Sequence, residues 1–325
     1  MTQLSVSGFR SIAEQACHRC GASPEVARSL VDATLSADRA GRKEVGVSHF
    51  LDYLKAFRDG RIDGAAVPEI TDPFPAFIDS DARGGIAQLG FDTAFDELCR
   101  RAKTYGIAIF TQRNSYPAGE IGYYVRRLAE RGLMAVAAAN ANAVMATAVG
   151  GARVYATNPM AFGAPLPPPH NHLVIDQASS ATAFVNIVRA AEEGCDIPEG
   201  WALDSARAPT VDPAKAMVGA LLPFGGYKGA NIALMVEVLS AGLSGASWSL
   251  DAADFRSGDR CPGIGLTVIA LSARDAGFER RLSEQVDRLR SLGVVIPGAA
   301  SPRGAYAADD LLEMDAALMT GIQRS

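Results

Sequence analysis

The sequence lacks both long apolar runs and concentrated charge of one sign. Its longest mainly apolar stretches, residues 133–139 and 232–241, are far shorter than the roughly 20 residues that a helix needs to cross a bilayer. The formal net charge is -5, and lysine and arginine form no cluster. A protein that binds a nucleic-acid backbone needs a clustered excess of both. We therefore expect neither a membrane-spanning protein nor a nucleic-acid-binding one.

Cysteine is also scarce. The five cysteines are an odd number spread over the whole length, which fits reduced thiols better than a disulfide framework. The first 15 residues have neither a basic start nor a continuous apolar core, so they predict a first helix and not a signal peptide. Cys17 and Cys20 have the spacing of a redox or metal pair, but no second group of ligands lies nearby. These features predict a cytoplasmic protein without a metal site.

What the chain has in quantity is apolar residues at regular spacings. Its 325 residues are 48% hydrophobic and 21% charged, which suits two or three packed lobes. Apolar positions recur every three or four residues through 5–39, where Ser23 and Pro24 provide the cap and first turn of a second helix. A further helix is expected over 47–59. The chain therefore begins with a helical region.

The rest of the chain alternates between helical and strand patterns, which is typical of an α/β protein. Strands are expected at residues 107–112, 133–139 and 173–176. Helices are expected at residues 91–105, 120–131, 181–193, 230–242, 276–292 and 308–322.

A glycine-rich segment, residues 223–229, opens one of these helices. It combines glycines, which let a backbone approach an anion, with Lys228 and a helix N-terminus. It is neither a Walker loop nor a Rossmann fingerprint. The alternative interpretation is a glycine-rich helix entry with a surface lysine.

The order of several segments resembles the malate/L-lactate dehydrogenase family, which binds NAD(P) without a Rossmann fold. That family includes lactate, malate, ureidoglycolate and sulfolactate dehydrogenases, a diketogulonate reductase, and reductases of Δ1-piperideine-2-carboxylate and Δ1-pyrroline-2-carboxylate. The similarity runs nearly end to end. It is carried by residues 37–53, 60–62, 114–124, 156–162, 175–180, 197–204, 209–213, 225–229 and 296–298.

The resemblance implies a particular architecture. We expect an α/β protein whose non-Rossmann NAD(P)-binding domain has a mixed, largely antiparallel sheet. Residues 1–70 and 285–325 are expected to form a helical lobe from both termini, and residues 71–284 the dinucleotide- and substrate-binding region. The family also implies a homodimer with shared active sites.

The resemblance further implies NAD(P)H as cofactor, with NADP somewhat preferred, and a small carboxylate as substrate. Thr157 matches a residue that contacts substrate. Arg303 is a candidate for the ribose 2′ position or, equally, a solvated loop arginine. The expected cofactor contacts are Tyr116, Pro117, Ala118, Gly119, Glu120, Ile121, Asp176, Gln177, Ala178, Tyr227, Lys228, Pro297 and Arg303.

The chain departs from the family where acid–base chemistry is expected. The Ser-His-Gly of the family, whose His donates the proton, is replaced by Glu44-Val45-Gly46. The Arg that binds the substrate carboxylate is replaced by His49, and a second family His by Pro117. In the cyclic-imine reductases an Asp stands where this chain has Asn186. The acid–base residues or the substrate must therefore differ.

His49 is the first candidate for the missing proton donor. A shift of four residues along a helix keeps the same face, so His49 could still point into the cleft, although it could also simply pack. Glu44 would need burial to raise its pKa. Tyr116 is a third catalytic candidate, and Tyr53 joins Thr157 and Asn186 as expected substrate contacts.

Three functions follow in order of preference. A protonated cyclic imine already carries positive charge and needs only hydride, so the loss of the family's His harms its reduction less than it harms carbonyl reduction. Reduction of Δ1-pyrroline-2-carboxylate or Δ1-piperideine-2-carboxylate is therefore preferred. The alternatives are a 2-hydroxy acid dehydrogenase with His49 as base, and a dinucleotide-binding protein without turnover.

Overall fold

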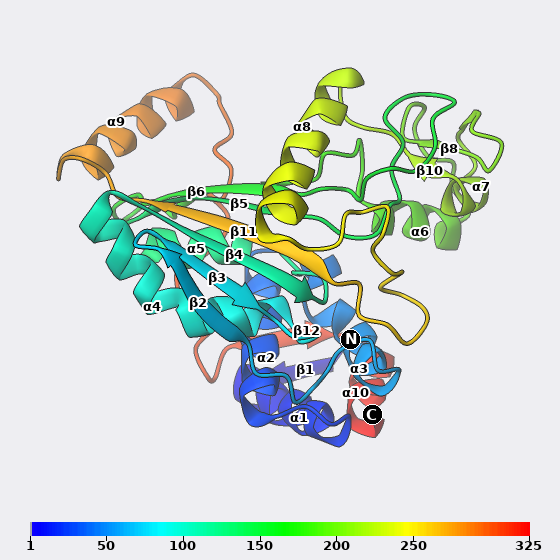
Figure 1. The fold of residues 1–325 in the computed structure, drawn as a ribbon, viewed down its shortest axis with the longest axis horizontal. Coiled ribbons are helices and arrows are strands. Elements are labelled where there is room, and N and C mark those ends of the chain that lie inside the picture. Colours follow the sequence, from blue (N-terminus) through cyan, green and yellow to red (C-terminus); the bar gives the residue numbers. More distant parts are fainter. Residues whose placement is uncertain (1) are drawn as a thin grey trace.

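A seven-stranded sheet forms the centre of the molecule (Figure 1). The computed structural model describes residues 2–325. All neighbouring strands are antiparallel except β3 and β4, which confirms the expected mixed, largely antiparallel sheet. In spatial order the strands are β2 (Glu69–Phe74), β3 (Phe77–Asp81), β4 (Ile107–Ser115), β11 (Ile264–Leu271), β5 (Met134–Ala139), β6 (Met160–Ala164) and β7 (Leu173–Gln177).

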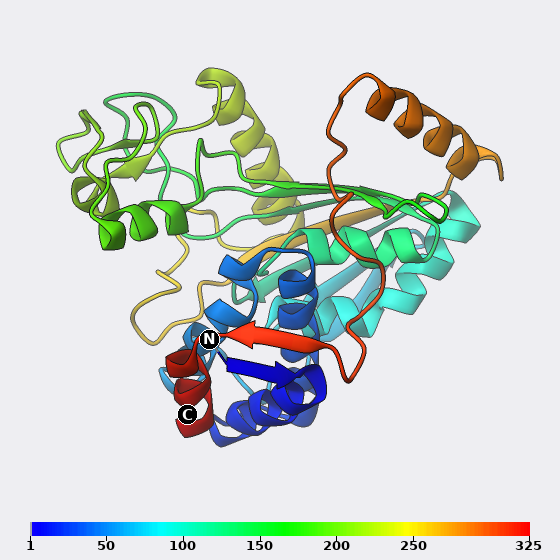
Figure 2. The same ribbon diagram turned by 180° about the vertical axis from the view of Figure 1, so that it is seen from behind.

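Helices cover both faces of this sheet. α4 (Ala87–Tyr105) and α5 (Gly122–Glu130) lie on one face, and α8 (Tyr227–Glu237) crosses the other (Figures 1 and 2). The central strand β11 is buried along nearly its whole length, which explains its continuous apolar sequence. α8 continues into a π-helical turn at Val238–Gly242. No helix in residues 2–325 is long and apolar enough to span a membrane.

The helical lobe contains a small sheet as well as helices. Strand β1 (Thr2–Ser5) pairs with β12 (Leu311–Met314), so both ends of the chain enter this lobe (Figure 2). Ser23 caps α2 as predicted, because its hydroxyl accepts the Val26 N–H at 3.2 Å. The helices of the lobe are α1 (Val6–Arg19), α2 (Pro24–Arg39), α3 (Phe50–Arg58) and α10 (Ala316–Arg324).

Two expectations for the C-terminal part need correction. A single helix over 308–322 is wrong, because residues 311–314 alternate between exposed and buried side chains and pair with β1 before α10 begins. The boundary expected at residue 285 falls inside α9 (Phe278–Ser291). Val286 of α9 packs against Leu166, which follows β6. Figure 1 shows α9 far from the helical lobe. The segment that joins the helical lobe is therefore shorter than expected.

A third region lies beside α8, and of its elements the sequence patterns predicted only the helix at residues 181–193. Its core includes Met145, Ile187, Ile197 and Leu221. Strands of two residues are too short to show a periodicity, so only the structure shows this sheet. The region comprises α6 (Phe184–Glu193), α7 (Pro213–Val218), β8 (Ala202–Leu203), β9 (Pro209–Thr210) and β10 (Ala220–Leu221).

The contact between β11 and the π-helical turn depends on a glycine. A Cβ on Gly265 would lie 2.2 Å from the backbone oxygen of Ser240. We predict that Gly265→Ala lowers the free energy of unfolding by about 1–3 kcal/mol, because backbone must move to admit the methyl group. Denaturant unfolding measures this. Gly242→Ala is the control, since the added methyl would meet only the edge of the partly exposed Trp248 ring. Equal stabilities of the two variants would contradict the prediction.

Candidate functional site

Asp176, at the end of β7, joins segments that are far apart in the sequence. The Gly122 N–H donates to its Oδ2 at 2.9 Å, at the start of α5. The Arg42 guanidinium donates to its backbone oxygen at 3.0 Å. Burial raises the pKa of Asp176, while the Gly122 N–H and Arg42 favour its ionised form. The predicted cofactor segments 116–121 and 176–178 are therefore adjacent.

Two more predicted cofactor segments form hydrogen bonds with β7 or with the residues just after it. The Val174 N–H donates to the Pro297 oxygen at 3.3 Å, and the Phe224 N–H donates to the Ser179 oxygen at 3.1 Å. Phe224 immediately precedes the glycines before Tyr227 and Lys228. The structure thus gathers the four segments along β7 and the residues directly after it.

The glycine-rich segment has the shape of an anion cradle. Gly225 and Gly226 have φ values of 57° and 62°, which favour glycine, and α8 begins directly after them. A Cβ on Gly229 would lie 2.1 Å from the Phe224 oxygen, so this residue must also be glycine. Tyr227 and Lys228 are exposed. Unpaired N–H groups of the first helical turn beside a lysine fit the phosphates of a dinucleotide.

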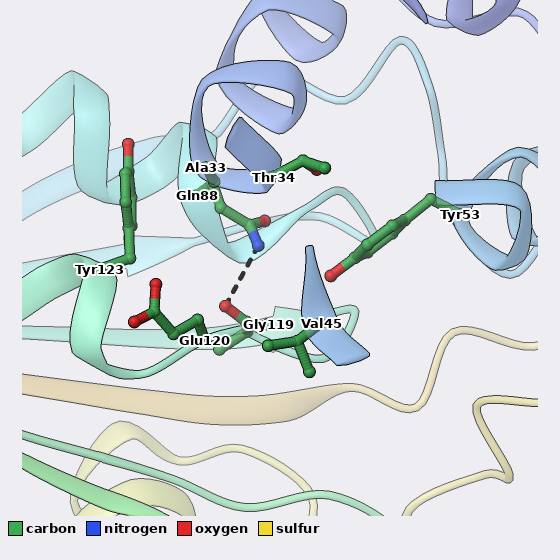
Figure 3. Close-up of a pocket in the computed structure, with 9 residues that line it drawn as sticks. Ala33, Thr34, Val45, Tyr53, Gln88, Gly119, Glu120 and Tyr123 are labelled. Carbon is green, nitrogen blue, oxygen red and sulfur yellow. Dashed lines mark hydrogen bonds between the residues drawn. The ribbon is translucent and has the colours of Figure 1, made fainter. Parts of the chain in front are cut away.

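A small cavity lies between α2, α4 and the segment before α5 (Figure 3). Val45, which replaces the family's proton-donating His, lines it together with Tyr53 and Gln88. The Tyr53 hydroxyl points into the cavity and would lie 3.1 Å from a Cβ on Gly119. A side chain at position 119 would crowd the Tyr53 hydroxyl, and the φ of 69° at this position also favours glycine.

Glu120 also borders this cavity, but its carboxylate is already paired. Figure 3 shows it turned away from Tyr53 and toward Tyr123. Its Oε2 accepts from Arg126 at 2.6 Å, and both side chains are buried. Burial raises the pKa of Glu120, and Arg126 opposes that shift. This pair anchors the start of α5.

His49 belongs to an unexpected local structure. Residues 43–49 form two 3-10 turns, Lys43–Val45 and Val47–His49, and not an extension of α3. Positions 45 and 49 therefore do not lie on one face of a single helix. His49 Nδ1 instead lies 2.8 Å from Asp52 Oδ2, and this hydrogen bond holds the pKa of Asp52 below its usual value.

Asp52 is a candidate site residue that the sequence patterns did not single out. Its spacing of three residues from His49 was the available signal, since such residues meet on one face of a helix. A donor at Nδ1 leaves Nε2 as the free nitrogen of the ring. The His49 ring, whose side chain is 25% exposed, packs edge-on against Tyr53 with centroids 5.1 Å apart.

Tyr116 has a structural role in this arrangement. It is buried, its ring packs against Tyr53, and its hydroxyl donates to the Phe255 oxygen at 3.0 Å. Burial raises its pKa. Arg61 donates to the same oxygen. The Tyr116 hydroxyl is therefore occupied, and the cofactor segment that follows it starts from a fixed point.

The remaining predicted residues have mixed placements. Glu44 is exposed, so the burial that a proton-donating role requires is absent. The Asn186 amide donates to Thr182 Oγ1 at 3.0 Å and accepts from Arg189 at 2.9 Å, both within its own helix region. Arg303 donates to the backbone oxygens of Leu166 and His170. The Asn186 and Arg303 side chains are therefore engaged within the chain, whereas Glu44 is exposed to solvent.

The comparisons with known proteins agree with this geometry. The model of the malate/L-lactate dehydrogenase family matches residues 4–302. The chain belongs to this family. The resemblance inferred from the sequence motifs is thereby confirmed.

Related proteins cover most of the chain. A Δ1-pyrroline-2-carboxylate/Δ1-piperideine-2-carboxylate reductase from Pseudomonas putida is 33% identical over 318 residues, 95% of this chain and 92% of the relative. A (2R)-3-sulfolactate dehydrogenase (NADP+) from Chromohalobacter salexigens is 35% identical over 280 residues, 84% and 81% of the two chains. The crystal structure of Δ1-piperideine-2-carboxylate reductase from Pseudomonas syringae pv. tomato has a TM-score of 0.87 at 33% identity, covering 93% of this chain and 92% of that one.

The occupied Tyr116 hydroxyl leads to a direct test. We predict that Tyr116→Phe costs about 0.5–1.5 kcal/mol of stability, the usual worth of one hydrogen bond, because Arg61 still donates to the Phe255 oxygen. Turnover should change less than about threefold. Loss of a general acid would instead lower it by about 10²–10⁴-fold. Steady-state kinetics with thermal unfolding distinguishes the two roles, and a hundredfold loss in a folded variant would make Tyr116 catalytic.

Proposed function

We propose that the chain reduces a cyclic 2-imino acid, Δ1-pyrroline-2-carboxylate or Δ1-piperideine-2-carboxylate, with NAD(P)H. The observation that carries this proposal is the convergence of four predicted cofactor segments along β7 and the residues directly after it, beside a cavity in which Val45 replaces the family's His. Several Pseudomonas relatives named for this reaction are 31–36% identical to the chain, which supports the same substrate class.

The chain's own groups suit a dinucleotide. The N-terminus of α8 with Gly225, Gly226 and Lys228 would hold phosphates, and the segments 116–121 and 176–178 would flank the nicotinamide half. When bound, the reduced cofactor supplies the hydride. The family relative named with NADP+ supports a preference for the phosphorylated form. Arg303 is not the proposed 2′-phosphate contact, because backbone oxygens occupy its guanidinium.

The protein's remaining task is to orient substrate and supply a proton. Hydride addition to the imine carbon leaves the electron pair on nitrogen, so the nitrogen must gain a proton before or during transfer. We propose His49 as the donor through Nε2, held in place by Asp52 at Nδ1. Tyr53 orients the ring from its edge, and Thr157 contacts the substrate.

A second function is favoured by the same histidine. A His–carboxylate pair is a suitable base for oxidising a 2-hydroxy acid, since the hydroxyl proton must leave as hydride departs. The sulfolactate dehydrogenase relative supports this alternative. Binding without turnover is the third outcome that an experiment must separate.

The first experiment follows NADH and NADPH absorbance with four substrates, the two cyclic imino acids, pyruvate and oxaloacetate. We predict turnover of the imino acids with NADPH. His49→Gln should lower kcat/KM by about 10²-fold or more, the usual worth of a general acid. Asp52→Asn should have a smaller effect, because Asn can still accept a hydrogen bond from Nδ1.

Ser48→Ala provides the control, since Ser48 is exposed beside the same histidine. Turnover confined to the oxo acids and lost in His49→Gln would transfer the proposal to the 2-hydroxy acid dehydrogenase. Cofactor binding without turnover of any of the four substrates would favour the binding protein. Full activity of His49→Gln would remove His49 from the mechanism.

We also propose that the chain acts as a homodimer in the cytoplasm. The five cysteines are unpaired, as expected for reduced thiols. Leu234 and Met235 of α8 and Val238 of the π-helical turn are between 48% and 56% exposed. These residues line a shallow apolar groove on the outside of the helix. An apolar patch of this kind suits a two-fold interface.

The dimer proposal predicts the effect of charge on this face. The double variant Leu234→Asp with Val238→Asp should convert the dimer to a folded monomer, because like charges would meet across the two-fold axis. Light scattering coupled to size-exclusion chromatography measures the mass. Leu292→Asp, on a leucine beyond α9 that is 80% exposed, is the control and should remain dimeric. A monomeric wild-type chain would contradict the proposal.

A further inference from the structure

Glu237, the last residue of α8, is a buried carboxylate without a cation partner. Its side chain is 3% exposed, and none of the ion pairs within residues 2–325 includes it. Oε1 accepts the Ser249 N–H at 2.6 Å, and Oε2 accepts the Ser249 hydroxyl at 2.7 Å and the Asn158 amide at 2.8 Å. A buried charge persists only where such donors replace its hydration.

Asn158 connects this carboxylate to the predicted substrate contact. It is fully buried and has a φ of 37°, an uncommon value for a residue with a side chain. Its Nδ2 donates to both Glu237 and the Ala233 oxygen of α8, each at 2.8 Å. Thr157 is the preceding residue, so these two bonds set the path of the backbone at Thr157.

Ser179 extends the connection to the cofactor segments. Its hydroxyl donates to the Asn158 oxygen at 2.8 Å and its N–H to the Thr157 oxygen at 2.7 Å. Its own oxygen accepts from Phe224 at the entrance to the glycine cradle. Ser179 also directly follows the segment 176–178. One hydrogen-bonded chain therefore runs from Glu237 to all three functional segments.

The two ends of α8 are thus connected by the helix itself and by the hydrogen bonds through Asn158 and Ser179. The cradle lies at its N-terminus, and Glu237 lies at its C-terminus, where the π-helical turn begins. π-Helical turns occur frequently at functional sites. The Glu237 chain returns from the C-terminal end of the helix to Phe224 at the N-terminal end, so a shift of α8 would move the cradle and Thr157 together.

We propose that Glu237 is a positioning residue that fixes Thr157 relative to the dinucleotide cradle through Asn158 and Ser179. The proposal rests on the function proposed above, because it assigns substrate and cofactor to those segments. Glu237 touches neither ligand, and its effect on catalysis passes through Asn158.

The central variant is Glu237→Gln. Gln keeps the shape but replaces one carboxylate oxygen by an NH2 group, so it cannot accept both the Asn158 amide and the Ser249 N–H, which bind different oxygens. We expect kcat/KM to fall by about tenfold or more, since small misplacements of positioning groups are costly. Ser249→Ala is the matched control, because it removes a bond to the same carboxylate and leaves Asn158 bound. It should lose stability and keep its kinetic constants within about threefold.

A reciprocal variant separates positioning from general destabilisation. In Glu237→Gln with Asn158→Asp, the amide and carboxylate exchange places, so an amide donor again faces a carboxylate acceptor, but the bond from position 158 to the Ala233 oxygen is lost. Recovery of part of the lost kcat/KM in this double variant would support the positioning role. If Ser249→Ala loses as much as Glu237→Gln at equal folded fraction, the positioning role is wrong.

Hydrogen exchange tests the same chain without any ligand. The amides of Ser179 and Phe224 should exchange at least about tenfold faster in Glu237→Gln than in Ser249→Ala, because only the first variant weakens the bond from Asn158 to residue 237. Unchanged exchange would overturn the proposal. This readout is independent of substrate, so a wild-type protein that turns over none of the tested compounds refutes the proposed function and leaves the inference about Glu237 to be decided by exchange.

Discussion

The hydrogen bond between the Gly122 N–H and the Asp176 carboxylate is the constraint on which the candidate site depends. It fixes the first turn of α5 against the last residues of β7, so a helix end and a strand end that are 54 residues apart share one point. Helix N-termini favour negative charge, and here the carboxylate of the chain itself occupies that place. The segment 116–121, the cradle before α8 and the loop at Pro297 are all placed relative to this point.

Local features of the fold could be predicted from the sequence, because their causes lie within a few residues. Ser23 before Pro24 specifies the start of α2, and the glycine-rich segment marks the entrance to α8, although the helix begins at Tyr227 and not at residue 230. The paired strands β1 and β12 could not be predicted in this way. Each depends on a partner about 310 residues away, and four residues carry too little pattern to override a helical interpretation.

The residues of the candidate site also differ in whether the sequence could predict their placement. The segments expected to hold the cofactor could be predicted by family resemblance, and the structure brings these expected segments together. The residues around His49 could not, because the helical register that placed its side chain is replaced by two 3-10 turns. The pairing of Asp52 with His49 is local, but the occupied hydroxyl of Tyr116 and the engaged guanidinium of Arg303 are consequences of tertiary contacts. Residue type alone does not reveal whether a polar group is free.

The pairing of β1 with β12 also bears on how the molecule assembles. The helices that surround His49 are made first during synthesis, yet the sheet that closes their lobe needs residues 311–314. Closing so long a loop carries an entropic cost and slows the step that completes the contact. The central sheet needs no residue beyond 271, so it can form earlier. The lobe that carries His49 is therefore finished last, after the surface on which a dinucleotide would lie already exists.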